Sequence, residues 1–96
     1  MAKVVFGDFE WDDLKAAANI KKHGVSFEEA ITALADPMAV GAPDLVFPQR
    51  WITIGRSALL RVLFVVHTES LLAGRVRIIS ARKASATQRR KYDEPN

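Results

Sequence analysis

The residues best suited to chemistry are two arginines and a lysine in the last quarter of the chain. Arg77 and Arg82 flank the segment Ile-Ile-Ser-Ala, and Lys83 follows directly. An arginine presents a planar, permanently charged fork that matches the oxygens of a phosphate group. Strand alternation puts Arg75, Arg77 and Ile79 on one face, so Arg82 is expected to point differently from Arg77. The pattern suits a phosphodiester clamp, and a solvated charge at a strand end is the alternative for Arg82.

The two histidines differ in their setting. His23 ends a predicted helix, where a role in packing and beside the helix dipole is favoured over catalysis. His67 ends the predicted central strand, and Glu69 lies two residues later on the same face of that strand. A neighbouring carboxylate favours the imidazolium and fixes the ring tautomer, as proton transfer requires. The alternative is a histidine whose hydrogen bonds are satisfied at a sheet edge.

Other basic and aromatic residues are candidates for contact with a nucleic acid. Those near predicted strand ends or on the last helix are Arg56, Arg61, Arg89, Arg90, Lys91 and Tyr92. A basic run on a helix can follow a phosphate backbone or meet an acidic protein, or it can be a solvated face. Tyr92 can stack on a base or donate a proton, or it can anchor the last helix to the sheet.

Charge is divided unevenly along the chain. Residues 1–49 hold eight acids and four bases, a net charge of −4. Residues 50–96 hold ten bases and three acids, a net charge of +7. A folded surface this one-sided attracts polyanions, among which RNA and DNA are abundant. A solvated basic face or an acidic protein partner explains the same pattern.

Length and composition limit the classes of protein. A chain of 96 residues predicts a single domain over residues 1–96. The absence of cysteine excludes disulfides, thiolate metal sites and a cysteine nucleophile. No His-Glu-x-x-His pattern or carboxylate cluster with ligand spacing is present, so no metal site is expected. The longest apolar run and the N-terminus suit neither a membrane span nor a signal peptide, so we expect a cytoplasmic protein.

The first half of the chain predicts one strand and two helices. The strand covers residues 3–11, and a helix from Asp13 to about His23 follows, with Asp12 as N-cap and Gly24 as stop. Residues 26–29 form a capping box in which Glu29 reaches back to the Ser26 amide. The second helix begins there and ends at residues 36–37.

The second half predicts mainly extended structure. We expect a short strand at 38–40, a loop at 41–49, strands at 51–55, 61–68 and 75–81, a hairpin connection at 70–74 and a helix at 85–92. The most apolar of these, 61–68, is expected at the centre of the sheet. The order β-α-α-β-β-β-β-α predicts an α+β fold, with two N-terminal helices and one C-terminal helix on an antiparallel or mixed sheet.

Several segments together carry a resemblance to a known family. They are F-E-W-D (9–12), K-A-x-x-N-x-x-K-H-G-V-S-F-E-E-A (15–30), I-G-R-S (54–57), V-V-H-T (65–68), R-I-I-S-A-R-K-A (77–84) and R-R-K-Y (89–92). The chain resembles, over about its whole length, the BrnT toxins of bacterial type II toxin–antitoxin systems. The resemblance implies a RelE-like fold, RNA cleavage that arrests growth, and a ribbon-helix-helix antitoxin of the BrnA type. It also implies that operator DNA is bound only through that antitoxin.

One position departs from the family pattern. Members usually carry a glutamate just before the arginines of the last helix, where this chain has Gln88. The missing carboxylate is expected either to remove an ion pair within the helix or to alter a side chain that faces the site. This departure bears on the role of the last helix.

The resemblance also suggests roles for the candidate residues. Cleaving RNA without a metal requires deprotonation of the 2′-OH, stabilisation of a phosphorane and protonation of the leaving 5′-oxygen. RelE-like toxins often replace the histidine pair of other ribonucleases with Arg, Lys and Tyr, which makes Arg82 the first candidate. Arg82 and Arg77 would hold the scissile phosphate, His67 beside Glu69 would transfer a proton, and Lys83 would guide the backbone.

The leading prediction is therefore a metal-independent endoribonuclease toxin that needs no cofactor. Its substrate would be messenger RNA, free or on the ribosome. The alternative is a non-catalytic nucleic-acid-binding or interaction module within an autoregulatory toxin–antitoxin complex. A toxin that acts on a target other than RNA is a third possibility.

Overall fold

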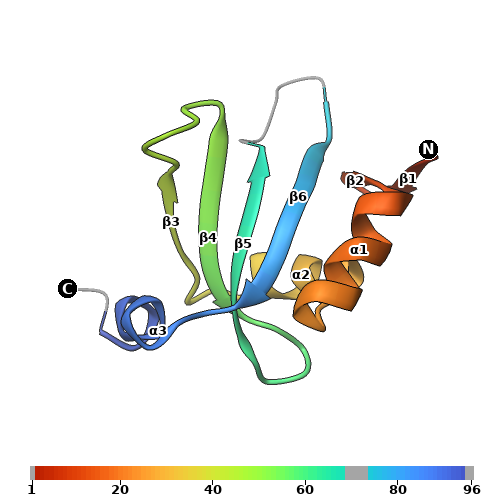
Figure 1. Cartoon of the computed structure of the whole chain (residues 1–96). Coiled ribbons are helices and arrows are strands. Elements are labelled where there is room, and N and C mark those ends of the chain that lie inside the picture. Colours follow the sequence, from red (N-terminus) through yellow and green to blue (C-terminus); the bar gives the residue numbers. More distant parts are fainter. Residues whose placement is uncertain (1, 69–73, 95–96) are drawn as a thin grey trace.

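A computed structural model describes residues 2–68 and 74–94 of the chain (Figure 1). Within these ranges, six strands form one sheet and three helices pack around it. The elements are β1 (Lys3–Phe6), β2 (Phe9–Asp12), α1 (Asp13–His23), α2 (Phe27–Leu34), β3 (Val40–Pro43), β4 (Arg50–Arg56), β5 (Val62–Thr68), β6 (Val76–Lys83) and α3 (Ala86–Asp93).

The sheet is mixed, and its strand order is β1-β2-β6-β5-β4-β3. Strands β2 and β6 run parallel, and the other neighbouring pairs run antiparallel. The prediction of an α+β fold with two N-terminal helices and one C-terminal helix is confirmed. Strand β5 lies inside the sheet, as its apolar sequence predicts.

The N-terminal segment is a hairpin, whereas one continuous strand was predicted over residues 3–11. Strands β1 and β2 pair from Lys3 opposite Asp12 to Phe6 opposite Phe9, which leaves Gly7 and Asp8 as a two-residue turn. Gly7 has a φ of 60°, a value that glycine adopts without a steric penalty. The order in the chain is therefore β-β-α-α-β-β-β-β-α, and the predicted order lacked the first turn.

Strand β3 begins and ends later than predicted. A strand was expected at residues 38–40 and a loop at 41–49. Strand β3 covers Val40–Pro43 and pairs with β4, with Val40 opposite Ile54 and Pro43 opposite Trp51. Pro43 suggested a loop because proline lacks the amide hydrogen that a sheet interior needs. Strand β3 lies at the edge of the sheet, where a proline is tolerated. The predicted connection at 70–74 lies, apart from Gly74, outside the described residues.

The helix ends agree closely with the sequence signals. The Asp12 carboxylate accepts hydrogen bonds from the amides of Leu14 and Lys15, and Gly24 ends α1 with a φ of 69°. The Ser26 hydroxyl accepts from the Glu29 amide at the start of α2. The second half of the predicted capping box is wrong, because the Glu29 carboxylate binds Arg61 and Ser57.

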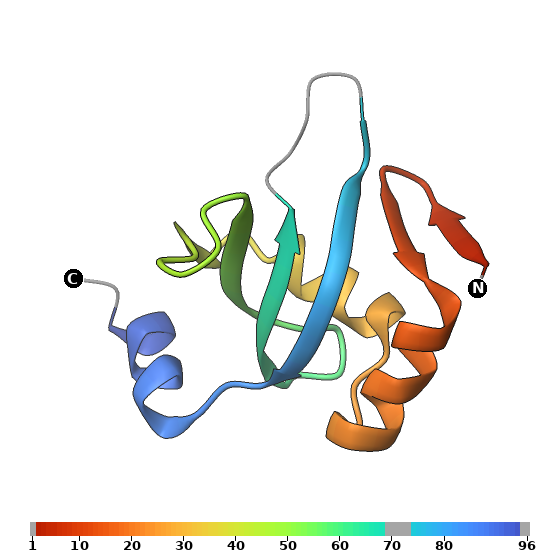
Figure 2. The ribbon, with the colours of Figure 1, turned by 45° about the horizontal axis from the view of Figure 1, so that its top comes forward.

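One face of the sheet is covered by α1 and α2 and holds the core, which we call the covered face (Figure 1). Its buried residues include Phe27 and Ala30 of α2 and Leu63, Val65 and Ile78 of the central strands. Figure 2 shows α3 set apart from the other helices, beyond the C-terminal end of β6. Helix α3 contacts β4 and β5, and the sheet surface beside it is the open face. In the described part of the chain, no helix is long and apolar enough to cross a bilayer.

Candidate functional site

A β-bulge in β6 determines where the candidate arginines point. His67 of β5 pairs with Ile78, whereas the preceding residue, Val66, pairs with Ser80, so Ile79 is an extra residue in the ladder. Ile78 and Ala81 are both buried in the covered face. Their neighbours Arg77 and Arg82 therefore both point to the open face. The expectation from uninterrupted alternation, that these arginines point differently, is wrong because of the bulge.

Arg82 lies at the centre of a small set of contacts on the open face. Its guanidinium carbon is 4.3 Å from the centroid of the Phe64 ring on β5. Its Nη1 donates to the Oε1 atom of Gln88 at 3.0 Å, and to the carbonyl oxygen of Lys83 at 3.3 Å. Among the described residues, no carboxylate forms a salt bridge with Arg82. The arginine is thus held in place while its charge is not neutralised.

Gln88 has two roles at the start of α3. Its Oε1 accepts from the Ser85 amide at 2.9 Å, and the Ser85 hydroxyl accepts from the Gln88 amide at 3.2 Å, which completes a capping box. The same oxygen binds Arg82. The position that departs from the family pattern therefore faces the candidate site.

Arg77 is held by the N-terminal hairpin. Its Nη1 donates to the Oε2 atom of Glu10 on β2 at 2.9 Å, and Lys3 lies 3.9 Å from the other oxygen of Glu10. Arg77 and Arg82 are five residues apart, which corresponds to roughly 15 Å along a strand. They share a face, but their partners Glu10 and Gln88 hold them in different directions.

His67 lies on the covered face and is buried, with an exposed fraction of 8%. Its Nε2 is 2.8 Å from the Thr53 hydroxyl, and its Nδ1 is 2.7 Å from the Thr68 carbonyl oxygen. Because a carbonyl only accepts, Nδ1 carries the hydrogen and Nε2 accepts from Thr53. Burial lowers the pKa of His67, against the opposing effect of the bond to Thr68. The structure thus separates a neutral His67 from both arginines. Its predicted partner Glu69 lies outside the described residues.

Arg61 takes part in a polar cluster between α2 and the β4–β5 turn. Its guanidinium donates through Nε and Nη2 to the two carboxylate oxygens of Glu29, and Nη2 also donates to the Gly24 carbonyl. The Ser57 hydroxyl donates to Glu29 at 2.6 Å. The hydrogen bonds from Arg61 hold the pKa of Glu29 below its usual value, despite burial. Arg61 therefore connects α2 to the β4–β5 turn. Its charge is balanced by Glu29, so its presence has a structural explanation that does not involve RNA.

Lys83 and Arg89 line a cavity of about 250 Å³ next to Arg61, at the end of β6 where α3 begins. Both side chains are exposed, and Arg89 lies 3.7 Å from Asp93 one turn along the helix. Arg90 is also exposed on α3. Lys83 follows Arg82 directly in β6, so strand alternation directs it away from the open face and toward this cavity.

Tyr92 anchors α3 to the loop after α2. Its hydroxyl donates to the Oδ2 atom of Asp36 at 2.6 Å, and the Arg56 amide donates to the same oxygen at 2.8 Å. The Arg56 guanidinium lies over the Tyr92 ring, at 5.8 Å from its centroid. The bond to Asp36 raises the pKa of Tyr92 and lowers that of Asp36. These contacts agree with the alternative in which Tyr92 anchors the last helix to the rest of the fold. Arg56 takes part in the same contacts.

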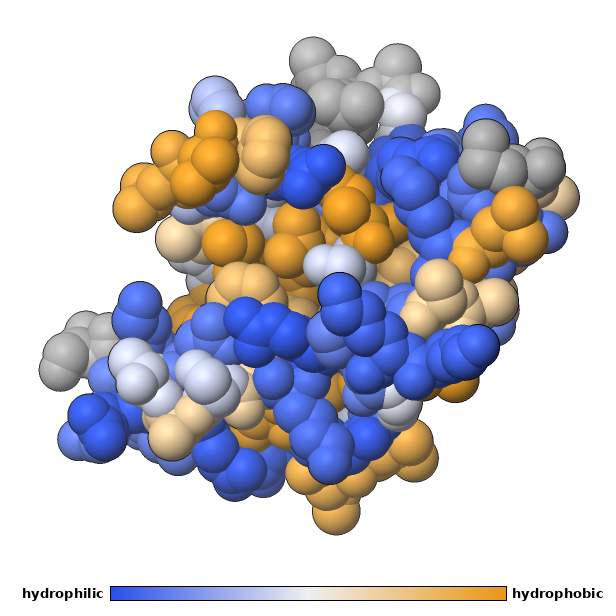
Figure 3. Space-filling view, viewed as in Figure 1, coloured by the Kyte–Doolittle hydropathy of each residue, from blue (hydrophilic) through white to orange (hydrophobic). Residues whose placement is uncertain are grey.

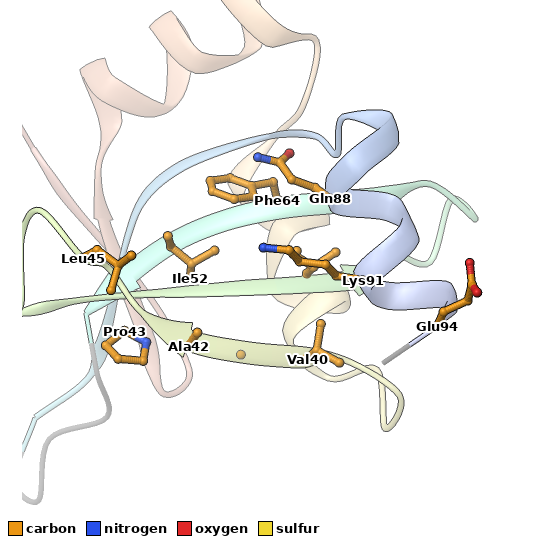
Figure 4. A pocket seen from close by; sticks show the side chains of 11 residues that line it. Val40, Ala42, Pro43, Leu45, Ile52, Phe64, Gln88, Lys91 and Glu94 are labelled. Carbon is orange, nitrogen blue, oxygen red and sulfur yellow. The ribbon is translucent and has the colours of Figure 1, made fainter. Parts of the chain in front are cut away.

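A groove of about 500 Å³ separates α3 from the edge of the open face (Figure 4). Its floor is apolar and is formed by Val40, Ala42, Ile52, Ile54 and Phe64. Its wall on the α3 side carries Gln88, Lys91 and Glu94. Figure 3 shows this hollow with an apolar floor beside the hydrophilic surface of α3. Sequence reasoning missed the groove and Phe64, because both depend on the strand register.

The candidate site thus combines a fixed cation, an aromatic ring beneath it and an adjoining groove. No three His, Cys, Asp or Glu side chains lie together as a metal site in residues 2–68 and 74–94. Sequence alone indicated the cations, and the structure adds the contacts that orient them. Arg82 is the candidate best placed to meet a phosphate group.

A family model described as "Ribonuclease toxin, BrnT, of type II toxin-antitoxin system" matches residues 11–88. A search of curated proteins found no match. Among solved structures, the chain is similar to the Brucella abortus ribonuclease toxin BrnT, with 28% sequence identity and a TM-score of 0.63 over 78% of this chain and 92% of that one. Because the family match covers most of its length, the chain belongs to the family of BrnT ribonuclease toxins of type II toxin–antitoxin systems.

Proposed function

We propose that this chain is a metal-independent endoribonuclease that cleaves RNA in the cytoplasm and so inhibits translation and growth. The family description supports a ribonuclease toxin, and the positive second half of the chain supports a polyanionic substrate. We further propose that a ribbon-helix-helix antitoxin of the BrnA type neutralises it and carries any contact with operator DNA. The RelE-like character of the fold stays a prediction.

The observation that carries this proposal is the environment of Arg82. A guanidinium over an aromatic ring and bonded to a neutral amide is oriented without losing its charge. Such a group stabilises the negative charge that develops on a phosphorane, because it needs no reorganisation during the reaction. Arg82 is therefore assigned to the scissile phosphate.

The other cations act along the RNA backbone in this proposal. Arg77, held by Glu10 on the same face, binds a phosphate farther along the RNA backbone. Lys83, Arg89 and Arg90 supply further positive charge at the end of β6 and on α3. Arg56 and Tyr92 contribute by holding α3 in place, and Arg61 by holding α2.

In the reaction the 2′-oxygen forms a bond to phosphorus as the bond from phosphorus to the 5′-oxygen breaks, while water accepts the 2′-OH proton and water gives a proton to the departing 5′-oxygen. His67 does not take part in this step in our proposal, because its ring is enclosed on the covered face. Arg82 lowers the barrier by binding the pentavalent phosphorus group more tightly than the starting phosphodiester.

The test is cleavage of labelled RNA by purified protein in the presence of EDTA. We expect Arg82→Ala to lower the cleavage rate by about 100-fold or more, as for loss of one preorganised donor. The matched control is Arg75→Ala, because Arg75 contacts only the Gly7 carbonyl among its described hydrogen bonds. Binding of RNA without cleavage by the unaltered protein would favour the non-catalytic alternative. Full activity of Arg82→Ala would remove Arg82 from the site.

A further inference from the structure

The groove beside α3 continues into an exposed apolar turn. Leu45 lines the groove and is 97% exposed, and Val46 is 76% exposed. The backbone of the turn is hydrogen-bonded within the turn, because the Asp44 carboxylate accepts from the amides of Val46 and Phe47 at 2.8 and 3.1 Å. The Arg50 amide also donates to the Phe47 carbonyl at 2.8 Å. With the turn in this conformation, the apolar side chains of Leu45 and Val46 are exposed to water, which is unfavourable. Such a surface is typical of a protein-binding site.

The chemistry of the groove favours a peptide segment over an RNA base. Its floor is mainly aliphatic, and its one aromatic ring, Phe64, is already covered by Arg82. Bases bind by stacking on aromatic or guanidinium planes, whereas aliphatic grooves accept the apolar side of an amphipathic segment. The groove thus has a polar wall on the α3 side and an apolar floor on the sheet.

The charges at the groove indicate which segment fits. Lys91 and Glu94 line the α3 wall, and Arg82 lies over the floor residue Phe64, so the groove has two cations and one carboxylate. Within the described part of the chain, neither cation forms a salt bridge with a carboxylate. A complementary segment carries aliphatic residues on one side and carboxylates on the other.

We propose that this groove and the turn at residues 44–47 bind an acidic, amphipathic segment of the antitoxin. The family supplies the occupant, because a toxin of a toxin–antitoxin system has a protein partner. Phe64 and Gln88 belong both to the groove and to the surroundings of Arg82, so a bound segment would cover the arginine. This last step, competition with RNA, rests on the proposed function.

The test uses the full chain and the antitoxin encoded beside it, both purified, with affinity measured by calorimetry. Leu45→Glu is expected to weaken binding at least 10-fold, because it places a carboxylate in the apolar contact. The matched control is Leu59→Glu, which makes the same change at a 66% exposed leucine in the β4–β5 turn and is expected to bind normally. Lys91→Glu is expected to weaken binding as well, with Lys22→Glu on α1 as its control.

Three outcomes separate the possibilities. Normal antitoxin affinity in both groove variants would overturn the proposal. Normal affinity combined with slower RNA cleavage in Leu45→Glu would assign the groove to RNA and would also overturn it. If the unaltered protein cleaves no RNA but the variants lose antitoxin affinity as expected, the docking site stands and the proposed ribonuclease function fails.

Discussion

At the scale of single residues, the pair formed by Arg82 and Gln88 connects the family pattern to the chemistry of the site. The amide oxygen of Gln88 orients the guanidinium, and it carries no charge that would compete with a phosphate. A carboxylate at the same position would bind Arg82 as an ion pair. The two predicted effects of this departure were loss of an ion pair within the helix and alteration of a side chain that faces the site. The structure agrees with the second, because the Gln88 side chain binds Arg82 of β6.

Gln88→Glu is therefore expected to weaken RNA binding by about 10-fold, which corresponds to about 1.4 kcal/mol. The physical reason is that the new carboxylate neutralises Arg82 and must be displaced by the phosphate. Thr87→Glu is the matched control, since it adds the same charge one residue earlier at an exposed position of α3. Equal RNA affinity of the two variants, measured by fluorescence anisotropy, would contradict the assigned role of Gln88.

Residue type was enough to predict Arg82 as a candidate, because an arginine after an apolar strand suits phosphate. It was not enough to predict Phe64 beneath it, because that contact needs the β5–β6 register in which Phe64 lies opposite Arg82. The same limit applies to Asn19, whose side chain bonds both Val25 and Ala81 across elements. Contacts between distant residues leave no periodic signal in a sequence.

At the scale of elements, the helix boundaries were largely predictable and the strands less so. Caps are local, so Asp12, Gly24, Ser26 and Ser85 give the helix ends directly. A bulge depends on the partner strand, so the extra residue Ile79 could not be found from β6 alone. The consequence is large, since this one residue brings both arginines to the open face.

Helix α3 depends on Tyr92 for its attachment to the rest of the fold. Tyr92→Phe removes the hydrogen bond to Asp36 and is expected to destabilise the docking of α3 by about 1 kcal/mol. The check is amide hydrogen exchange, which should become faster in residues 86–93 and stay unchanged in α1. Uniformly unchanged exchange would show that the hydroxyl does not hold the helix.

At the scale of the whole molecule, the core and the candidate site lie on opposite faces of the sheet. The covered face encloses the core together with His67, and the open face carries the groove and the arginines. His67 was a candidate for proton transfer because it ends the predicted central strand and Glu69 follows two residues later on the same face. Burial, which only the fold determines, places it among the core residues.

This burial predicts a pH dependence of stability. The pKa of His67 is lowered in the folded protein, so between that value and the unfolded value of about 6.5 the unfolded chain binds more protons. The stability is therefore fully present above about pH 6.5 and falls as the pH decreases below it. Thermal melts at pH 7.5 and 5.5 are expected to show a loss that is smaller in His67→Gln. An equal loss in both proteins would place the titrating group elsewhere.

The parallel pairing of β2 with β6 has a consequence for synthesis of the chain. Phe9 and Glu10 lie opposite Val76 and Arg77, so strand β2 gains this neighbour only after more than three quarters of the protein has been made. Contacts this far apart in sequence form late during folding. A ribosome translating this chain would thus expose the N-terminal hairpin before β6, its neighbour in the sheet, has been made. Because Arg82 lies in the same late strand, we expect a nascent chain that still lacks β6 to cleave no RNA.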